Sequence, residues 1–185
     1  QLILVAGVRE LLDEKLKENG KKPIYKDGMR VTDDETMRYL KETSGATRFE
    51  IESSLARGFR GRPGQSGINV VSGNFLYTAK PLGVRNGIDF KLTGEVRRIE
   101  VQNINQRLEQ GDICMLTSLG YSPSGEVFNV QSETLAAECA AKLDAAKIVY
   151  LTEGELLVDT RPVKSGGLNY RAAEIADGYT VMQNL

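Results

Sequence analysis

Apolar and polar positions at the start of the chain predict a buried strand followed by a helix. Residues 2–5 form a continuous apolar run, which is typical of a strand covered on both faces. A turn at residues 6–7 leads into a segment where leucines recur at helical spacing, at Leu11, Leu12 and Leu16. Asn19-Gly20 then ends the helix.

A short hairpin and a second helix are predicted next. Asp27-Gly28 is a typical tight turn between two short extended segments. Thr32 and Glu35 have the spacing of a capping box, which predicts that a helix starts there. An imperfect apolar stripe continues this helix to about residue 57, and Gly45 within it is expected to permit close packing.

Residues 57–67 interrupt the regular pattern. They contain four glycines, three arginines and one proline, a composition that cannot build a core and indicates an exposed loop. Arg57, Arg60 and Arg62 could form an anion patch. Because Phe59 is the only aromatic residue between them, the pattern does not favour nucleic-acid binding.

The middle of the chain alternates strands with helices. Strands are predicted at residues 68–72, 74–80, 113–116 and 147–151, a hairpin at 83–91, and helices at 101–110 and 134–143. Arg97 and Arg98 lie on a further β-rich segment, where only one of them can face inward. Gly73 and Gly94 are expected to adopt unusual backbone angles. The alternation predicts an α/β fold with a largely parallel sheet.

The last part of the chain has a weaker pattern. Residues 155–159 predict a short strand, Gly166-Gly167 a turn and residues 170–176 a short helix. We find no internal repeat, no low-complexity tract and no linker, so a single domain is expected.

Composition removes several classes of function. The 24 basic and 25 acidic residues give a formal net charge of -1, so no global field draws the chain to nucleic acid or to an anionic membrane. The apolar runs are much shorter than the roughly 20 residues that span a bilayer, so we expect no membrane span. A small anionic metabolite remains a plausible ligand.

The chain contains no histidine, which removes the usual general base near neutral pH and the usual zinc ligand. Cys114 and Cys139 lie in apolar and alanine-rich segments, where a thiol behaves as a small buried hydrophobe. We therefore expect no metal site. The chain also begins inside an apolar strand without a methionine or a signal peptide, and we expect a segment upstream of it.

Several motifs carry a family resemblance. Residues 28–33 read Gly-Met-Arg-Val-Thr-Asp, which resembles the G-x-R-V-T-D signature of acetylglutamate kinases and of the kinase-like domain of N-acetylglutamate synthases. Residues 71–75, 83–90 and 93–99 resemble the synthases rather than the kinases. Residues 119–130 are again similar to the synthases, and they lead into the alanine-rich helix as in that family.

The resemblance implies a fold and a domain division. It implies a three-layer α/β/α sandwich of the amino-acid-kinase, or carbamate-kinase-like, type with a mainly parallel sheet. Residues 1–153 would form this domain, without its first strand and its C-terminal half. Residues 154–185 are left as an unassigned tail.

The resemblance also suggests vestigial substrate-binding residues. Arg30 would hold the carboxylate of a glutamate-like ligand through a bidentate pair, although its sequence context also fits a surface or capping arginine. Asn129 would donate to the amide or the carboxylate of an acylated glutamate, although it also fits a turn or a helix cap. Glu133 is expected to be a first-turn helix acid rather than a base.

The phosphate-binding elements of the kinases are not retained. Their first turn reads G-G-G-P, whereas residues 6–9 here read Ala-Gly-Val-Arg, which leaves Gly7 as the remnant of the loop and lets Val8 and Arg9 crowd a phosphate. The family's N-A-D run is replaced by Gln-Ser-Glu at residues 131–133. Its two nucleotide-binding lysines fall in regions that this chain does not include. We therefore expect no catalytic residue for phosphoryl transfer.

The implied function is that of a regulatory and oligomerisation domain. Synthases of this kind make N-acetylglutamate from acetyl-coenzyme A and L-glutamate, the first step of arginine biosynthesis, with a separate acetyltransferase domain. The resemblance thus implies no cofactor in this chain, acetyl-coenzyme A in the missing domain, and L-arginine or a glutamate-like small molecule as ligand. A homo-oligomer or larger assembly is implied, in the cytoplasm or, in a eukaryote, the plastid or mitochondrial matrix.

Two alternatives remain open at this point. The first is an active acetylglutamate kinase, which the motif at residues 28–33 favours and the turn at residues 6–9 opposes. The second is a non-catalytic remnant that acts only as a structural subunit.

Overall fold

The computed structural model describes all residues except 57–67, 152–162, 166–167, 176–178 and 185. The chain divides into two compact units, residues 1–132 and 133–185. The predicted loop at residues 57–67, the predicted strand at 155–159, the turn at 166–167 and the boundary at residue 153 lie outside the described residues.

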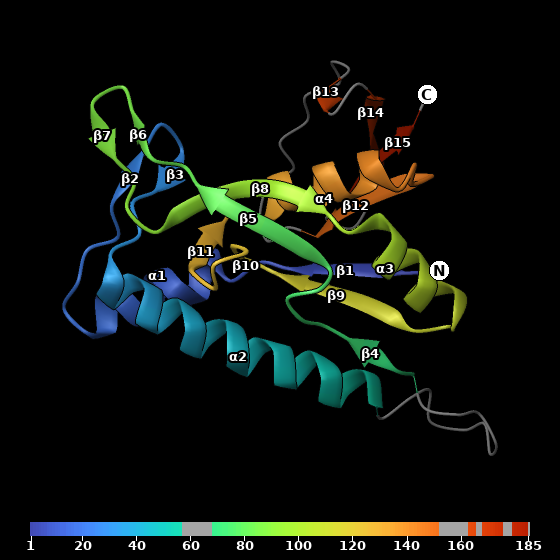
Figure 1. Ribbon diagram of the computed structural model, residues 1–185, viewed down its shortest axis with the longest axis horizontal. Helices are drawn as coiled ribbons and strands as arrows, with labels where there is room; N and C mark the ends of the chain where they lie inside the picture. The colour runs from blue at the N-terminus through green and yellow to red at the C-terminus, as the bar shows by residue number, and fades with distance from the viewer. Residues whose placement is uncertain (57–67, 152–162, 166–167, 176–178, 185) are drawn as a thin grey trace. The chain divides into compact units, whose positions relative to one another are not determined.

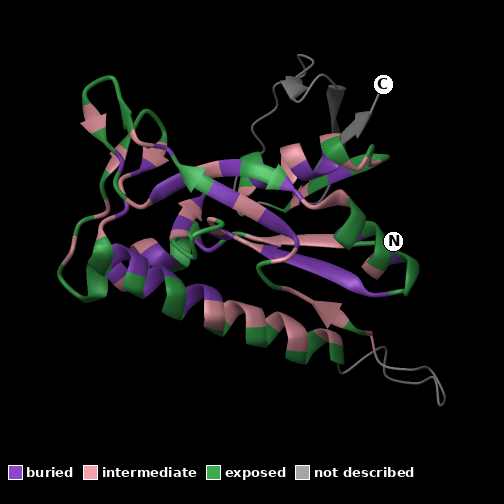
Figure 2. Cartoon of the chain, in the orientation of Figure 1, coloured by how far each residue is buried: buried purple, intermediate pink, exposed green. Residues whose placement is uncertain are grey.

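A three-stranded parallel sheet forms the centre of the first unit (Figure 1). Strand β9 (Ile113–Thr117) lies between β1 (Ile3–Ala6) and β4 (Val70–Val71), and both neighbours run parallel to it. The first four residues of β9 are buried, which explains why this strand has a continuous apolar sequence rather than an alternating one (Figure 2). The predicted α/β class with parallel strands is confirmed.

A second β-structure in the same unit is a closed barrel in the order β10-β11-β8-β5. Its strands are β5 (Tyr77–Pro81), β8 (Thr93–Ile99), β10 (Leu119–Tyr121) and β11 (Val127–Val130). The pairs β5–β8 and β10–β11 are antiparallel, whereas β10–β5 and β11–β8 are parallel. The sequence pattern did not predict β10 and β11, which are short and separated by a turn of polar residues.

Arg97 occupies a bulge in β8, because Thr78 pairs with Arg98 while Ala79 pairs with Val96. Both arginines are exposed. The limit of at most one inward-facing arginine holds, and neither faces inward, since the extra residue breaks the strict alternation of the strand.

Three helices belong to the first unit: α1 (Arg9–Glu18), α2 (Asp34–Ala56) and α3 (Val101–Glu109). Helices α1 and α2 pack together, α2 also contacts β1 and β11, and α3 contacts β9 (Figure 1). A buried apolar cluster joins α1 to α2 and consists of Val8, Leu12, Leu16, Met37, Tyr39 and Leu40. Removal of these side chains from water is the main stabilising contribution of the helical layer.

Helix α2 starts where predicted, but its capping residue is different. The Asp33 carboxylate accepts a hydrogen bond of 2.9 Å from the backbone N–H of Thr36, so Asp33 caps the helix. Thr32 is fully buried and its hydroxyl bonds to other strands. The predicted capping box of Thr32 and Glu35 is therefore wrong, because tertiary contacts occupy the threonine.

Of three glycines singled out from the sequence, one has the expected role and two do not. Gly73 has a φ of 154°, as predicted for an unusual backbone angle. Gly94 has no such angle, and a Cβ there would lie 2.6 Å from the Phe128 Cβ and 2.7 Å from the Lys80 carbonyl oxygen. Gly94 is therefore required for close packing. Gly45, predicted to permit close packing, has no heavy atom within 4 Å of its Cβ position and faces open space.

Two hairpins complete the first unit, β2–β3 (Tyr25–Lys26 and Met29–Arg30) and β6–β7 (Val84–Arg85 and Ile88–Asp89). Their turns carry positive φ at Asp27-Gly28 and at Asn86-Gly87, the geometry of two-residue hairpin turns. The two turns meet at a hydrogen bond of 3.3 Å from the Asn86 side chain to the Asp27 carboxylate. Both predicted hairpins are confirmed.

The second unit contains most of α4 (Ser132–Lys142), with Glu133 in its first turn as predicted, and strand β12 (Lys147–Leu151). Strand β12 pairs antiparallel with β15 (Tyr179–Asn184), which pairs with β14 (Leu168–Ile175), and β13 (Val163–Ser165) follows. The predicted helix at residues 170–176 is therefore wrong. Pairing of β14 on both sides satisfies its backbone and overrides the helix propensity of its sequence.

In the described part of the chain, no helix is long and apolar enough to cross a membrane. The same residues contain no group of three or more histidine, cysteine or acidic side chains placed to hold a metal ion.

Candidate functional site

The turn between β1 and α1 packs closely against Ser132, the last residue of the first unit. A Cβ on Gly7 would lie 2.7 Å from the Ser132 hydroxyl oxygen, so glycine is required at this position for the two segments to approach. The neighbouring Val8 is buried in the cluster of α1 and α2. The Val8 side chain therefore packs into the core, and the expectation that Val8 and Arg9 crowd a phosphate at this turn stays a prediction.

Arg30 ends the β2–β3 hairpin and its guanidinium is buried. Its Nη1 atom forms an ion pair with Asp13 Oδ1 at 2.6 Å, and its side chain is only 6% exposed. Its Nη2 atom donates to the Arg9 carbonyl at 3.2 Å and to the Tyr25 hydroxyl. A ligand carboxylate would have to replace Asp13 or approach another edge of the guanidinium, so the predicted ligand role of Arg30 stays a prediction.

Tyr25 connects the charges around Arg30. Its hydroxyl donates to Asp13 Oδ2 at 2.9 Å, and both Arg9 and Arg30 stack on its ring, at 4.6 and 4.7 Å from the centroid. Burial raises the pKa of the Tyr25 phenol, and the Asp13 carboxylate raises it further, while Arg30 opposes the shift. Two cations, one anion and one neutral phenol therefore lie together at the N-terminal end of α1.

Asn129 lies on β11, opposite Leu119 on one side and Thr93 on the other. Its side-chain Nδ2 lies 2.9 Å from the Thr32 hydroxyl oxygen. That hydroxyl lies 2.9 Å from the Thr93 hydroxyl, which in turn is 2.5 Å from the Arg30 carbonyl oxygen. A buried row of hydrogen bonds thus connects the two predicted ligand residues, Arg30 and Asn129.

The three residues singled out from the sequence are brought together only in part. Arg30 reaches the β1–α1 turn through the Arg9 carbonyl and reaches Asn129 through two threonines. Gly7 meets Ser132, and no described contact joins Gly7 directly to Arg30 or Asn129. Sequence reasoning missed Asp13, Tyr25 and Thr93, because nothing in the spacing of these residues along the chain relates them to Arg30.

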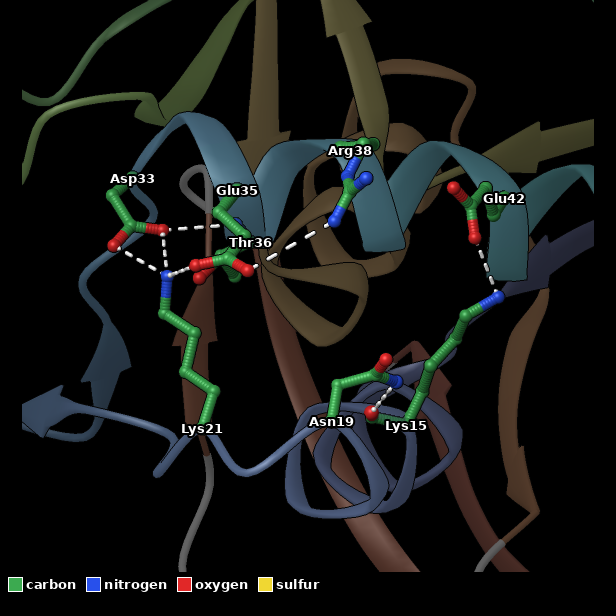
Figure 3. A network of polar contacts seen from close by, with 8 residues as sticks. All are labelled: Lys15, Asn19, Lys21, Asp33, Glu35, Thr36, Arg38 and Glu42. Carbon is green, nitrogen blue, oxygen red and sulfur yellow. Dashed lines mark hydrogen bonds and ion pairs between the residues drawn. The ribbon is translucent and has the colours of Figure 1, made fainter.

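A second polar cluster fixes the start of α2 beside the end of α1 (Figure 3). Lys21 contacts Asp33 at 2.8 Å and Glu35 at 2.9 Å, and Lys15 contacts Glu42 at 2.7 Å. Burial alone would raise the pKa of Asp33, but hydrogen bonds from Lys21 and Thr36 outweigh it and hold that pKa well below its usual range. The cluster therefore positions the segment that carries Thr32.

The site offers polar groups that suit binding of a small molecule. Arg30 and Arg9 can attract an anion, and Asn129 can bond an amide or a carboxylate. The arrangement suits recognition of a small molecule that carries carboxylate and amide groups.

Comparison with known proteins supports this description. The family described as "Amino acid kinase family" matches residues 1–173. An amino-acid acetyltransferase of Shewanella oneidensis is 38% identical over 160 residues, which cover 86% of this chain and 36% of that protein. An amino-acid acetyltransferase of Pseudomonas fluorescens is 37% identical over 188 residues, covering 93% of this chain and 43% of that protein.

The chain is also similar in structure to a solved enzyme of this kind. The N-acetylglutamate synthase of Neisseria gonorrhoeae in complex with coenzyme A and L-arginine has a TM-score of 0.74 and 32% identity, and the match covers 78% of this chain and 34% of that one. The same enzyme with coenzyme A and N-acetyl-glutamate has a TM-score of 0.70. The resemblance to the synthases is confirmed. The chain spans less than half the length of these relatives.

Proposed function

The chain belongs to the amino acid kinase family, and we propose that it is the kinase-like regulatory and oligomerisation domain of an N-acetylglutamate synthase. The observation that carries this proposal is the 38% identity to an amino-acid acetyltransferase over 86% of the chain. The parent protein would transfer the acetyl group of acetyl-coenzyme A to L-glutamate. Acetyl-coenzyme A would bind outside the residues of this chain.

The proposed ligands are L-arginine, acting as a feedback inhibitor, and a glutamate-like molecule. The similar Neisseria enzyme was solved in complexes with L-arginine and with N-acetyl-glutamate. In this chain the buried Arg30 and the half-buried Asn129 supply a cation and an amide, the groups that recognise a carboxylate and an acylated amine.

Acetylglutamate kinase activity is the weaker alternative. Phosphoryl transfer needs cations that neutralise the charge spreading over the transferred group. The turn at residues 6–9 keeps one glycine of the kinases' G-G-G-P turn, and the relatives reported above are named acetyltransferases and synthases. A non-catalytic remnant within a larger assembly would share this geometry. The length and the enzymatic activity of the natural protein therefore have to distinguish a remnant from a synthase.

Purification of the protein from its natural source, followed by intact mass measurement and enzyme assays, tests the proposal. We expect a mass near 50 kDa, which is roughly the mass of a full synthase of the kind that the sequence resembles. We also expect the protein to transfer an acetyl group to L-glutamate and L-arginine to inhibit this reaction. A mass close to the 20.4 kDa of this chain without acetyl transfer would favour the remnant. Formation of ADP with N-acetylglutamate and ATP would favour the kinase.

A further inference from the structure

The row of hydrogen bonds between Arg30 and Asn129 contains a fixed number of protons. Each threonine hydroxyl donates one hydrogen and accepts up to two, whereas the Arg30 carbonyl only accepts. The Thr93 hydroxyl lies 2.5 Å from the Arg30 carbonyl oxygen and 2.9 Å from the Thr32 hydroxyl oxygen, and it also accepts from the Thr32 backbone N–H at 3.2 Å. Thr93 is buried, and Thr32 is fully buried.

Only one assignment places a proton in every contact. Two oxygen atoms 2.5 Å apart repel unless a hydrogen lies between them, so Thr93 must donate to the Arg30 carbonyl. The contact between the two hydroxyls then requires the proton of Thr32. Because Thr32 has no further hydrogen, its oxygen must accept from Asn129, and only the Nδ2 end of that amide can donate.

We propose that Thr32 and Thr93 are positioning residues that fix the side-chain amide of Asn129, with Nδ2 toward Thr32 and Oδ1 away from it. The two ends of an amide look alike in most structures and are assigned from their hydrogen bonds, and here the count of protons determines the assignment. No donor among the described residues reaches Asn129 Oδ1, and the side chain is half-buried. The Asn129 Oδ1 atom, at the end of this row of hydrogen bonds, can therefore accept a hydrogen bond from a ligand.

This orientation specifies the ligand group that Asn129 recognises. This step rests on the proposed function. A glutamate-like ligand would donate a hydrogen bond from an N–H group to Asn129 Oδ1. The donor would be the amide N–H of an N-acylated glutamate or the ammonium group of the free amino acid. Asn129 was expected from the sequence to act as a donor, whereas the fixed orientation makes an acceptor its main free group.

The Asn129→Asp variant of the 185-residue chain tests the orientation without any ligand. An ionised aspartate has nearly the same shape but cannot donate, so Thr32 must reverse its proton and one oxygen contact in the row loses its hydrogen. We expect the urea midpoint of unfolding to fall by about 1 M. In a Thr93→Val background the Thr32 hydroxyl is free to donate to the aspartate, and the same substitution should lower the midpoint much less.

The Thr93→Ser background is the matched control, because serine keeps the hydroxyl and should retain the full penalty of Asn129→Asp. General effects of a new charge appear in all three backgrounds and cancel in the double-mutant cycle. Equal penalties with threonine and with valine at position 93 would overturn the proposal. Because the cycle contains no ligand, a failure of the proposed function leaves its outcome unchanged.

If Asn129→Asp does not fold, side-chain amide NMR of the unmodified chain decides the orientation. We expect one Nδ2 proton of Asn129 to exchange with water at least 10-fold more slowly than those of the exposed Asn74, and Thr32→Val, which removes the accepting hydroxyl, to abolish this protection. Exchange at the Asn74 rate in the unmodified chain would contradict the proposal.

Binding of N-acetyl-L-glutamate and of its N-methyl derivative, measured by calorimetry, tests the ligand step separately. The N-methyl derivative lacks the N–H and should bind at least 10-fold more weakly. Equal affinities would show that Asn129 Oδ1 does not receive this N–H. Failure of both compounds to bind would count against the proposed function and leave the orientation to the unfolding cycle.

Discussion

Arg30 and Asp13 form an ion pair of 2.6 Å between the β2–β3 hairpin and helix α1, and the arginine side chain is 6% exposed. The same guanidinium donates to the Arg9 carbonyl at the start of α1, and the Arg30 backbone begins the row of hydrogen bonds to Asn129. Arg30, which was predicted to bind a ligand, thus also connects the β2–β3 hairpin to helix α1. Substitutions around Arg30 should therefore change stability as well as binding.

The Asp13→Asn substitution should lower the free energy of unfolding by about 3 kcal/mol, because it leaves the buried guanidinium of Arg30 without its anion. The exposed Glu14 on the same helix provides the control, since Glu14→Gln should change stability by less than about 0.5 kcal/mol. Urea unfolding followed by circular dichroism measures both. Similar small effects of the two substitutions would show that the ion pair between Arg30 and Asp13 contributes little to the free energy of unfolding.

Gly45→Ala and Gly94→Ala should have opposite effects although they are the same chemical change. Gly45 lies in α2 facing open space, so alanine should stabilise the protein by about 0.5–1 kcal/mol. At Gly94 the new methyl group would lie 2.7 Å from a backbone oxygen, and we expect a loss of about 1–3 kcal/mol. Thermal unfolding of both variants provides the comparison, and effects of the same sign would contradict it.

Asp33 should contribute stability that depends on pH. Its folded pKa lies well below the unfolded value of about 3.9, so the contribution is complete above that value and is lost as the pH falls through the folded pKa. Asp33→Asn keeps a capping side chain but removes the charge, and should be less stable than the unmodified chain at pH 7 by about 1 kcal/mol or less. The difference should shrink below about pH 4.

Unfolding of the two proteins in urea between pH 7 and pH 2 measures this effect. Asp33→Ala, which also removes the cap, should lose about a further 1 kcal/mol at every pH. A difference between the unmodified chain and Asp33→Asn that does not change with pH would mean that the Lys21 contact does not shift the Asp33 pKa in the folded protein.

The 185-residue chain should bind L-arginine weakly or not at all, although we expect the parent synthase to bind it. A guanidinium ligand needs paired carboxylates, and the resemblance places most of these outside the residues of this chain. A ligand at 100 times its Kd would stabilise the fold by about 2.7 kcal/mol and raise the Tm by several degrees.

Thermal melts with millimolar L-arginine and with L-lysine as the control distinguish these outcomes. A rise of several degrees that is specific to L-arginine would show that the pocket is complete within this chain. Addition of acetyl-coenzyme A should leave the Tm unchanged, since its site is expected in a separate domain.

Most local elements and the family could be predicted from the sequence. Strand β9 is a continuous apolar run because it is buried, and Asp27-Gly28 encodes a hairpin turn because these residues tolerate positive φ. The start of α2 was also predictable, since acidic residues favour a helix N-terminus. Such features depend on neighbours along the chain, and a short window of sequence contains all the information that they need.

The partners of the residues in the candidate site depend on tertiary packing and could not be predicted. Asp13, Thr32 and Thr93 come from a helix, a hairpin connection and a barrel strand, and their bonds to Arg30 and Asn129 exist only after these elements pack. The same reason explains the two clearest errors, the capping role of Thr32 and the helix at residues 170–176. In both cases hydrogen bonds to distant segments outweigh the local preference, because a buried backbone or hydroxyl group must find a partner wherever the fold provides one.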